Sequence, residues 1–184
     1  MAKKMNDNTA LFLAGGLALI GVILGIRKGI VSAKKVGTES EIISGLAWVI
    51  DNYGRSFAEN VERVLRWESA HFKSKQWIDG NTAGMEATTI TFPYGWSSLS
   101  EFVNDMDIDP SVFTTYTMTE NNTGITKRFI RFPDAYTFII FLAWFIKNKR
   151  GGRFGYWYSL DEASARRYEN NIAGVVPRYV NEIS

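Results

Sequence analysis

The apolar positions of this chain follow two patterns, a continuous one near the start and a periodic one after residue 36. Residues 10–26 form a run of 17 positions without a charged side chain. As a helix that rises 1.5 Å per residue, this run would extend roughly 26 Å, which is close to the thickness of a bilayer core. The two patterns together predict a membrane anchor over residues 1–35 and a globular domain over residues 36–184.

A cleaved signal peptide is the alternative interpretation of the same segment. Lys3 and Lys4 would form its basic beginning, and residues 31–33 (Val-Ser-Ala) resemble a small-residue cleavage site. We favour an uncleaved, single-pass anchor, because Arg27 and Lys28 interrupt the apolar run before that site. The lipid bilayer is therefore an expected partner, and the flanking basic side chains can meet lipid headgroups.

Two further features of the apolar run concern its packing and its orientation. Gly21 and Gly25 form a GxxxG pattern, which can bring two anchors close together and so predicts a homo-oligomer through the anchor as one option. More Lys and Arg residues follow the run than precede it, so the positive-inside rule would place the globular domain in the cytoplasm.

Helical periodicity, capping residues and turn residues predict the elements of the globular part. The expected helices cover residues 39–51, 56–70, 135–146 and 177–183. A further helix is expected to begin at a capping box at 159–162 and to run to about residue 173. The expected strands cover residues 112–119 and 125–132, with a hairpin turn at 121–124 between them. Between residues 71 and 110 the periodicity is too poor to predict an element. Helices, then a β hairpin, then helices indicate an α+β domain, in which the apolar helix 135–146 is too short to span a bilayer and is expected to lie buried at the centre.

The helix expected over residues 56–70 carries an anomaly on its apolar side. Glu62 and Arg66 form an i,i+4 pair in the favourable order, which indicates a solvated face. Glu68 follows Val64 by four positions, so it belongs to the apolar side of the same helix. A carboxylate in that place is expected to be paired, to lie at the edge of a cleft, or to have a raised pKa.

Composition and charge exclude several classes of function. The chain has no cysteine and a single histidine, His71, so neither a disulfide nor a thiolate or zinc site is expected. After residue 35 there are 15 basic and 18 acidic residues, which is not the basic footprint of a nucleic-acid-binding domain. No phosphate-cradling glycine loop is present either. We therefore expect no metal, no cofactor and no nucleic-acid partner.

The remaining candidates for chemistry are two carboxylates. Glu68 is on the core side of a helix end, and Glu120 is at the tip of the expected hairpin. A helix-borne acid that faces a second acid across a groove is the arrangement that glycoside hydrolysis requires. One carboxyl would stay protonated in an apolar setting and donate to the leaving oxygen, while the ionised one would activate water or stabilise positive charge at the sugar.

Several segments, in the same order, resemble the peptidoglycan β-N-acetylglucosaminidases of the flagellar and autolysin type (glycoside hydrolase family 73). Residues 68–74 (Glu-Ser-Ala-His-Phe-Lys-Ser) resemble the Glu-Ser-Gly-Trp-Gly-x-Ser signature of that family. Residues 81–86 resemble its Asn-Leu-Phe-Gly-Ile-Lys segment, and residues 117–124 its Thr-x-Glu followed by an Asn-Gly hairpin. Residues 127–134 are similar to its strand-to-helix passage, and residues 174–179 to its closing segment.

The resemblance covers roughly residues 56–184 and implies a lysozyme-like, mostly helical fold. It implies Glu68 as the general acid and Glu120 as the second carboxylate. Substrate contacts are expected at Ser69, Phe72, Asn81, Trp96, Tyr116 and Tyr179. Among these residues, Phe72, Trp96 and Tyr116 are the candidates for stacking against a sugar ring. The sequence departs from the signature where His71 and Phe72 replace its Trp-Gly, and residues 87–110 resemble an insertion.

Three functions follow as expectations. The first is a membrane-anchored peptidoglycan hydrolase that cuts the β-1,4 bond next to N-acetylglucosamine, in a bacterial envelope or in the membrane of a phage particle. The second is a catalytically weak structural or wall-docking component of such a particle or of a secretion machine. The third is a lytic transglycosylase, which would need only the acid Glu68.

Overall fold

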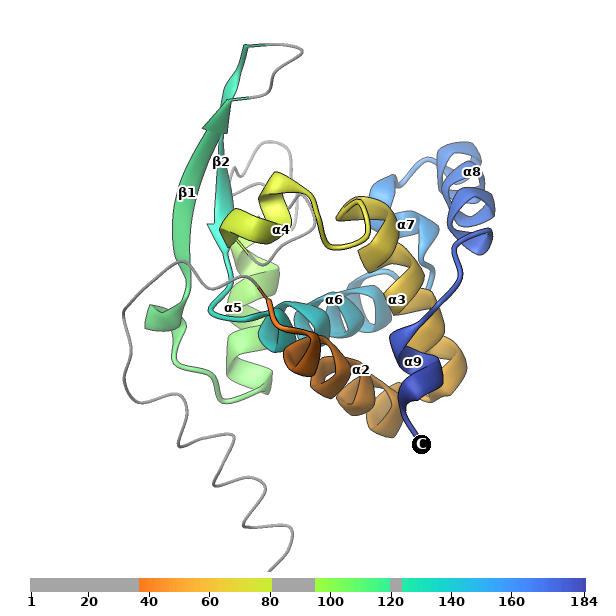
Figure 1. The fold of residues 1–184 in the computed structure, drawn as a ribbon. Coiled ribbons are helices and arrows are strands. Elements are labelled where there is room, and N and C mark those ends of the chain that lie inside the picture. Colours follow the sequence, from red (N-terminus) through yellow and green to blue (C-terminus); the bar gives the residue numbers. More distant parts are fainter. Residues whose placement is uncertain (1–36, 81–94, 120–123) are drawn as a thin grey trace, which may run out of the picture. The chain divides into compact units, whose positions relative to one another are not determined.

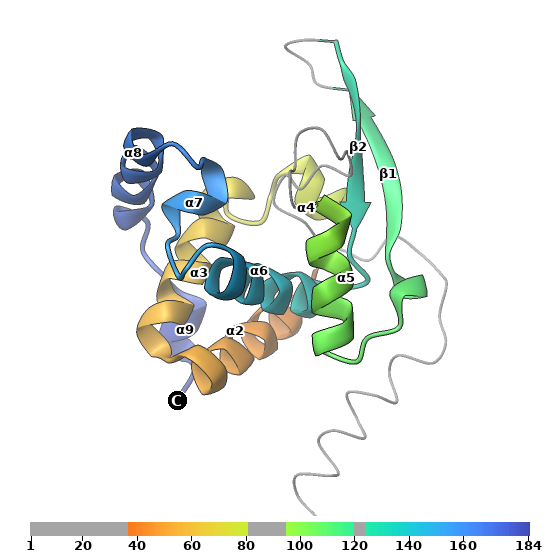
Figure 2. The same ribbon diagram turned by 180° about the vertical axis from the view of Figure 1, so that it is seen from behind.

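The computed structural model describes residues 37–80, 95–119 and 124–184 of the 184-residue chain. Its elements are the helices α2 (Glu39–Tyr53), α3 (Arg55–Glu68), α4 (Lys75–Gly80) and α5 (Gly95–Asp105), the 3-10 turn η1 (Pro110–Val112), the strands β1 (Thr114–Thr119) and β2 (Thr126–Arg131), and the helices α6 (Ala135–Lys149), α7 (Gly155–Tyr158), α8 (Glu162–Ala173) and α9 (Tyr179–Glu182). The part described is therefore α+β, mostly helical with one antiparallel hairpin, and this much of the predicted fold class is confirmed. Figures 1 and 2 show the arrangement from two opposite sides.

Helix α6 is the central element of the core, as its apolar sequence predicted. Every residue from Thr137 to Ile146 is buried, and so is Ala135. Asp134 starts the helix by accepting a hydrogen bond from the backbone N–H of Thr137 at 2.6 Å. Helices α2 and α3 pack along one side of α6, and α5 lies toward the hairpin (Figure 2).

The first two described helices begin and end close to the predicted positions. Thr38 caps α2 with a capping box, in which its Oγ1 accepts from the N–H of Glu41 at 3.3 Å and its own N–H donates to the Glu41 carboxylate at 3.1 Å. Gly54, with a φ of 88°, separates α2 from α3 in a conformation that favours glycine. Of the apolar stripe expected on α3, Val61, Val64 and Leu65 are buried and Phe57 is half-buried.

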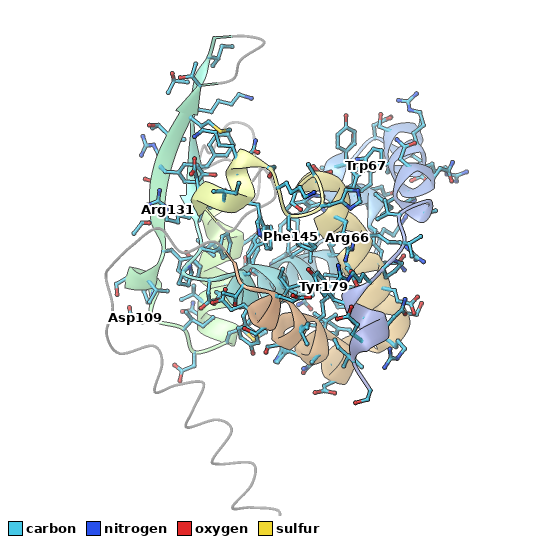
Figure 3. The ribbon with its side chains drawn as sticks, in the orientation of Figure 1. Arg66, Trp67, Asp109, Arg131, Phe145 and Tyr179 are labelled. Atoms are coloured by element: carbon cyan, nitrogen blue, oxygen red, sulfur yellow. The ribbon has the colours of Figure 1, made fainter. Side chains whose placement is uncertain are left out.

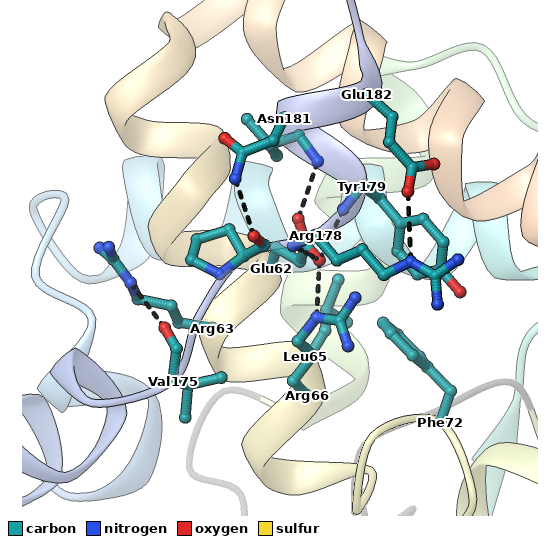
Figure 4. A network of polar contacts seen from close by, with 12 residues as sticks. Glu62, Arg63, Leu65, Arg66, Phe72, Val175, Arg178, Tyr179, Asn181 and Glu182 are labelled. Atoms are coloured by element: carbon teal, nitrogen blue, oxygen red, sulfur yellow. Dashed lines mark hydrogen bonds and ion pairs between the residues drawn. The ribbon is translucent and has the colours of Figure 1, made fainter.

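The prediction that Glu62 lies on a solvated face is wrong. Its carboxylate is fully buried and does pair with Arg66, at 2.6 Å. The same carboxylate accepts the backbone N–H groups of Arg178, Tyr179 and Val180 at 2.7, 3.0 and 2.9 Å (Figure 4). These are the orphan donors at the start of α9, so Glu62 caps a helix that lies far away in the sequence.

The hairpin pairs β1 and β2 in antiparallel register, with Tyr116 opposite Phe129. It is attached to α4, a helix that the sequence did not predict. The N–H of Phe132 donates to the carbonyl of Gly80 at 2.9 Å, and Nε of Arg131 donates to the carbonyl of Asp79 at 2.9 Å. A Cβ on Gly80 would lie 2.4 Å from the Tyr116 ring, so the absence of a side chain there allows the close approach.

The second helix missed by the sequence analysis is α5, which contributes the buried side chains of Leu99, Phe102 and Val103 to the core. Helices α4 and α5 both fall in the stretch 71–110, where short elements and glycines obscure the periodicity.

Helix α8 is present where it was predicted, but its cap is different. Asp161, rather than Ser159, accepts the hydrogen bond from the N–H of Ser164, at 2.8 Å. The preceding short helix α7 was not predicted, and it packs very closely on α8. A Cβ on Gly155 would lie 2.3 Å from the carbonyl oxygen of Ala165, so only glycine fits at this contact.

The predicted anchor, residues 1–35, lies outside the described residues. Among the helices of residues 37–80, 95–119 and 124–184, none is both long and apolar enough to cross a bilayer.

Candidate functional site

Glu68 is the last residue of α3, at the point where the chain leaves the helix toward α4. Figure 3 places its neighbour Trp67 where the end of α3 meets α7 and α8. The carboxyl group therefore lies at the end of a rigid helix rather than on a long loop, which is a favourable place for a reacting group.

The backbone after Glu68 adopts a strained, left-handed turn. Ala70, His71 and Phe72 have φ values of 49°, 57° and 67°, although none of them is glycine. The left-handed conformation costs a residue with a side chain roughly 1–2 kcal/mol. Strain of this kind persists only where the surrounding structure enforces it, and it clusters at functional sites.

Ser69 is the residue that enforces the turn. Its hydroxyl donates to the carbonyl of Leu65 and accepts from the N–H of Phe72 at 2.7 Å. Its own carbonyl accepts from the N–H groups of Lys73 and Ser74 at 2.8 and 2.7 Å. Ser69, expected to contact substrate, is fully buried, and in this structure its side chain shapes the turn.

Burial raises the pKa of the Glu68 carboxyl above its ordinary value of 4.5. A smaller, opposite influence comes from the hydroxyl of Tyr168, which favours the ionised carboxylate. Burial, followed by the charge of Glu68, raises the pKa of Tyr168 in turn. That hydroxyl is buried and makes no hydrogen bond of regular geometry with the described residues, so the two groups interact without a well-formed bond.

A carboxyl group with a raised pKa stays protonated closer to neutral pH, so it can donate that proton to a substrate. This is the property of a general acid in glycoside hydrolysis. A raised pKa was one of the three alternatives expected for Glu68, and burial favours that one, whereas its catalytic role stays a prediction.

Two of the residues expected to contact substrate, Phe72 and Tyr179, lie together. Their ring centroids are 5.7 Å apart, and the guanidinium of Arg66 lies 5.4 Å and 5.0 Å from the two rings. Phe72 also packs edge-on against the buried Trp77, at 4.9 Å. The left-handed turn is thereby joined to α9 through a partly exposed cation–π cluster.

Tyr116, also expected to contact substrate, packs against α4. Its ring lies 5.6 Å from that of Phe129, and its hydroxyl donates to the carbonyl of Gln76 at 3.4 Å. Burial and the nearby charge of Asp79, opposed by Arg131, raise the pKa of Tyr116 to about 12. Its described contacts are those of a residue that attaches the hairpin to α4.

The other expected site residues are only partly described. Trp96 belongs to α5, but its side chain lies outside the described part of the structure. Asn81 and Glu120 also lie outside the described residues. The separation of Glu68 and Glu120, which would indicate the stereochemistry of hydrolysis, therefore stays open.

A pocket beside Glu68 was missed by the sequence analysis. It has a volume of about 290 Å³ and is lined by Trp67, Tyr158, Ser164, Arg167, Tyr168 and Asn171. Trp67 follows Val64 by three positions, so its spacing predicts a place on the buried, apolar face of α3 rather than at the surface. Tyr158 belongs to α7 and Tyr168 to α8, and no pattern in the sequence indicates that they lie in the same place as Trp67.

Comparison of the chain with protein-family models, with curated proteins and with solved structures gave no match.

Proposed function

We propose that this protein is a membrane-anchored peptidoglycan hydrolase with a lysozyme-like domain. It cuts the β-1,4 bond next to N-acetylglucosamine, with Glu68 as the general acid and Glu120 as the second carboxylate. The observation that carries the proposal is the carboxyl of Glu68, which stands at the end of a helix and has a pKa raised by burial. The resemblance of residues 68–74 to the glucosaminidase signature supports the same residue.

In this mechanism, protonated Glu68 donates its proton to the glycosidic oxygen as the bond to the sugar lengthens. Positive charge then develops on the sugar ring, and the ionised carboxylate of Glu120 stabilises it or activates the attacking water. The order of elements supports this assignment: the helix with the acid comes before the hairpin, and a buried helix follows directly after it.

The proposed location is a bacterial envelope or the membrane of a phage particle, with residues 1–35 as a single-pass anchor. Glycan strands of peptidoglycan are the proposed partner. The 17 uncharged residues from 10 to 26 and their basic flanks support the anchor.

A zymogram on purified peptidoglycan tests the proposal, with the full chain in detergent micelles. Glu68→Gln removes the acidic proton and keeps the shape, and we expect it to lower the rate of clearing by about 100-fold or more. Glu120→Gln is expected to lower it as well. Glu59→Gln is the matched control, because it lies on the same helix, nine residues or roughly 13 Å along the axis from Glu68.

Three outcomes discriminate between the candidate functions. Clearing by the wild type that survives in Glu68→Gln would refute the assignment of the acid. No clearing by the wild type would favour the structural, wall-docking role. A 1,6-anhydro sugar among the products, detected by mass spectrometry, would indicate a lytic transglycosylase in place of a hydrolase.

A further inference from the structure

The pocket beside Glu68 presents aromatic rings to solvent. The side chains of Trp67 and Tyr158 are 48% and 66% exposed. Tyr158 stacks on Tyr168 with ring centroids 5.2 Å apart and an angle of 7° between the planes. Large aromatic residues gathered at the rim of one pocket are a common feature of ligand sites, because the rings offer wide apolar faces at a low cost in conformational entropy.

Polar side chains also line the pocket. Tyr168 is 3% exposed, and among the described residues its hydroxyl makes no regular hydrogen bond. This hydroxyl interacts with the carboxyl of Glu68, so the wall of the pocket reaches the proposed acid. The side chains of Ser164 and Asn171 add further hydrogen-bonding groups to the wall.

One positively charged side chain, that of Arg167, also lines the pocket. Arg166 and Arg167 are consecutive, exposed residues of α8. Arg166 forms a salt bridge with Glu162 at 2.8 Å, and it is not part of the pocket. Arg167 lines the pocket and donates to the hydroxyl of Ser164 at 3.0 Å, and it forms no salt bridge with the described residues. Its guanidinium can therefore bind a carboxylate of a ligand.

Aromatic faces, hydrogen-bonding side chains and one guanidinium together match an N-acetylated sugar that carries a carboxylate. We propose that this pocket binds such a sugar, with the pyranose ring stacked on Trp67 and Tyr158 and the carboxylate on Arg167. The choice of ligand rests on the proposed function, since the muramic acid units of peptidoglycan have this chemistry where the stem peptide has been removed from the lactyl group. The pocket would then hold a unit of the glycan next to the acid Glu68, because Tyr168 touches both.

Isothermal titration calorimetry of the full chain in detergent micelles tests the proposal with two matched probes. The first is the disaccharide of N-acetylglucosamine and N-acetylmuramic acid, and the second is chitobiose, which lacks the lactyl carboxylate. We expect the wild type to bind the first about tenfold more tightly. The dipeptide derivative of the first probe, in which an amide blocks the lactyl carboxylate, is expected to lose the preference; a preference that it keeps would overturn the assignment of Arg167 to the carboxylate of the sugar.

The variants separate stacking from charge recognition. Trp67→Ala is expected to weaken the binding of both probes by about tenfold or more, whereas Tyr158→Phe keeps the ring and stays within about twofold. Arg167→Gln is expected to remove the preference for the carboxylated probe and to leave chitobiose binding within about twofold. The controls are Arg166→Gln, and Leu160→Ala, which truncates an exposed apolar side chain outside the pocket.

The proposal is overturned if the wild type binds neither probe, if Trp67→Ala and Arg167→Gln both leave the affinities unchanged, or if Arg166→Gln has the same effect as Arg167→Gln. Circular dichroism checks the fold of each variant. If Trp67→Ala does not fold, Tyr158→Ala and Arg167→Gln decide the question, because both side chains are exposed. Binding without any cleavage of peptidoglycan supports the pocket and refutes the hydrolase, whereas cleavage that needs Glu68 with binding that ignores Trp67 refutes the pocket alone.

Discussion

At the scale of single residues, Glu68 experiences two opposing influences on its pKa. Burial, the larger influence, favours the protonated carboxyl, and the hydroxyl of Tyr168 favours the ionised form. The balance leaves the pKa raised, so the folded protein binds this proton more tightly than the unfolded chain does. Stability contributed by the group is therefore greatest below the unfolded pKa, near 4.5, and decreases as the pH rises through the folded pKa.

This sign leads to a prediction for Glu68→Gln, which is neutral at every pH. Relative to the wild type, the variant should gain stability as the pH is raised from about 4 to about 8, because only the wild type must then bury a charge. Thermal unfolding of both proteins at several pH values measures the difference in Tm. Tyr168→Phe, which removes the group that favours the ionised form, should raise the folded pKa and extend the loss of stability at high pH.

The pair of wild type and Glu59→Gln, on the same helix, gives the baseline for this measurement. A difference in Tm between wild type and Glu68→Gln that stays constant with pH would contradict the raised pKa.

Two glutamates of α3 show what could be predicted at this scale. The unusual position of Glu68 followed from its spacing to Val64 alone, since helical geometry fixes the face of each residue. The burial of Glu62 did not, because its i,i+4 spacing to Arg66 is the same in a solvated pair and in a buried one. Its decisive partners are backbone groups of residues 178–180, which no local pattern indicates.

At the scale of elements, the C-terminal helix α9 depends on one carboxylate of α3. Helices as short as α9 are not stable on their own. Glu62 accepts three backbone N–H groups at its start, and Arg55 donates to the carbonyls of Val180 and Ile183 at 2.8 and 2.6 Å. The end of the chain is therefore held by side chains of α3 at both ends of the short helix.

We predict that Glu62→Ala lowers the free energy of unfolding by about 3 kcal/mol, because it leaves Arg66 and three N–H groups without their charged acceptor. Glu59→Ala on the same helix should change it by less than about 0.5 kcal/mol. Urea unfolding at neutral pH measures both values. Hydrogen exchange gives a second readout, since the amides of residues 178–180 should lose protection in Glu62→Ala; unchanged protection would show that the cap is not needed.

The predicted helix α6 is long and has a clear apolar pattern of its own, whereas the missed helix α4 is short and depends on contacts with other elements. Helix α6 was predicted because eleven of the twelve residues after Asp134 are apolar or aromatic, so a helix of these residues has to lie in the core. Helix α4 was missed because it has six residues, too few to show a period, and is fixed by contacts with the hairpin rather than by its own sequence. The pocket was missed for a similar reason, because residues of α3, α7 and α8 form it together and no single segment shows it.

At the scale of the whole molecule, the described core uses side chains between Ile42 and Val180. We therefore predict that residues 36–184 fold without the first 35, with a circular dichroism spectrum and Tm close to those of the full chain. The full chain should float with phospholipid vesicles in a density gradient, and the shortened chain should not, because it lacks the apolar run 10–26. Flotation of the shortened chain would locate the membrane contact elsewhere.

In the last turn of α3, three consecutive residues have three different roles. Arg66 reaches Glu62 and the rings of Phe72 and Tyr179, Trp67 lines the pocket, and Glu68 meets Tyr168. Successive residues of a helix point about 100° apart, so this division of tasks is a matter of helical phase. Inserting or deleting a single residue within α3 would turn each side chain into the direction of its neighbour, without altering a single amino acid of the site.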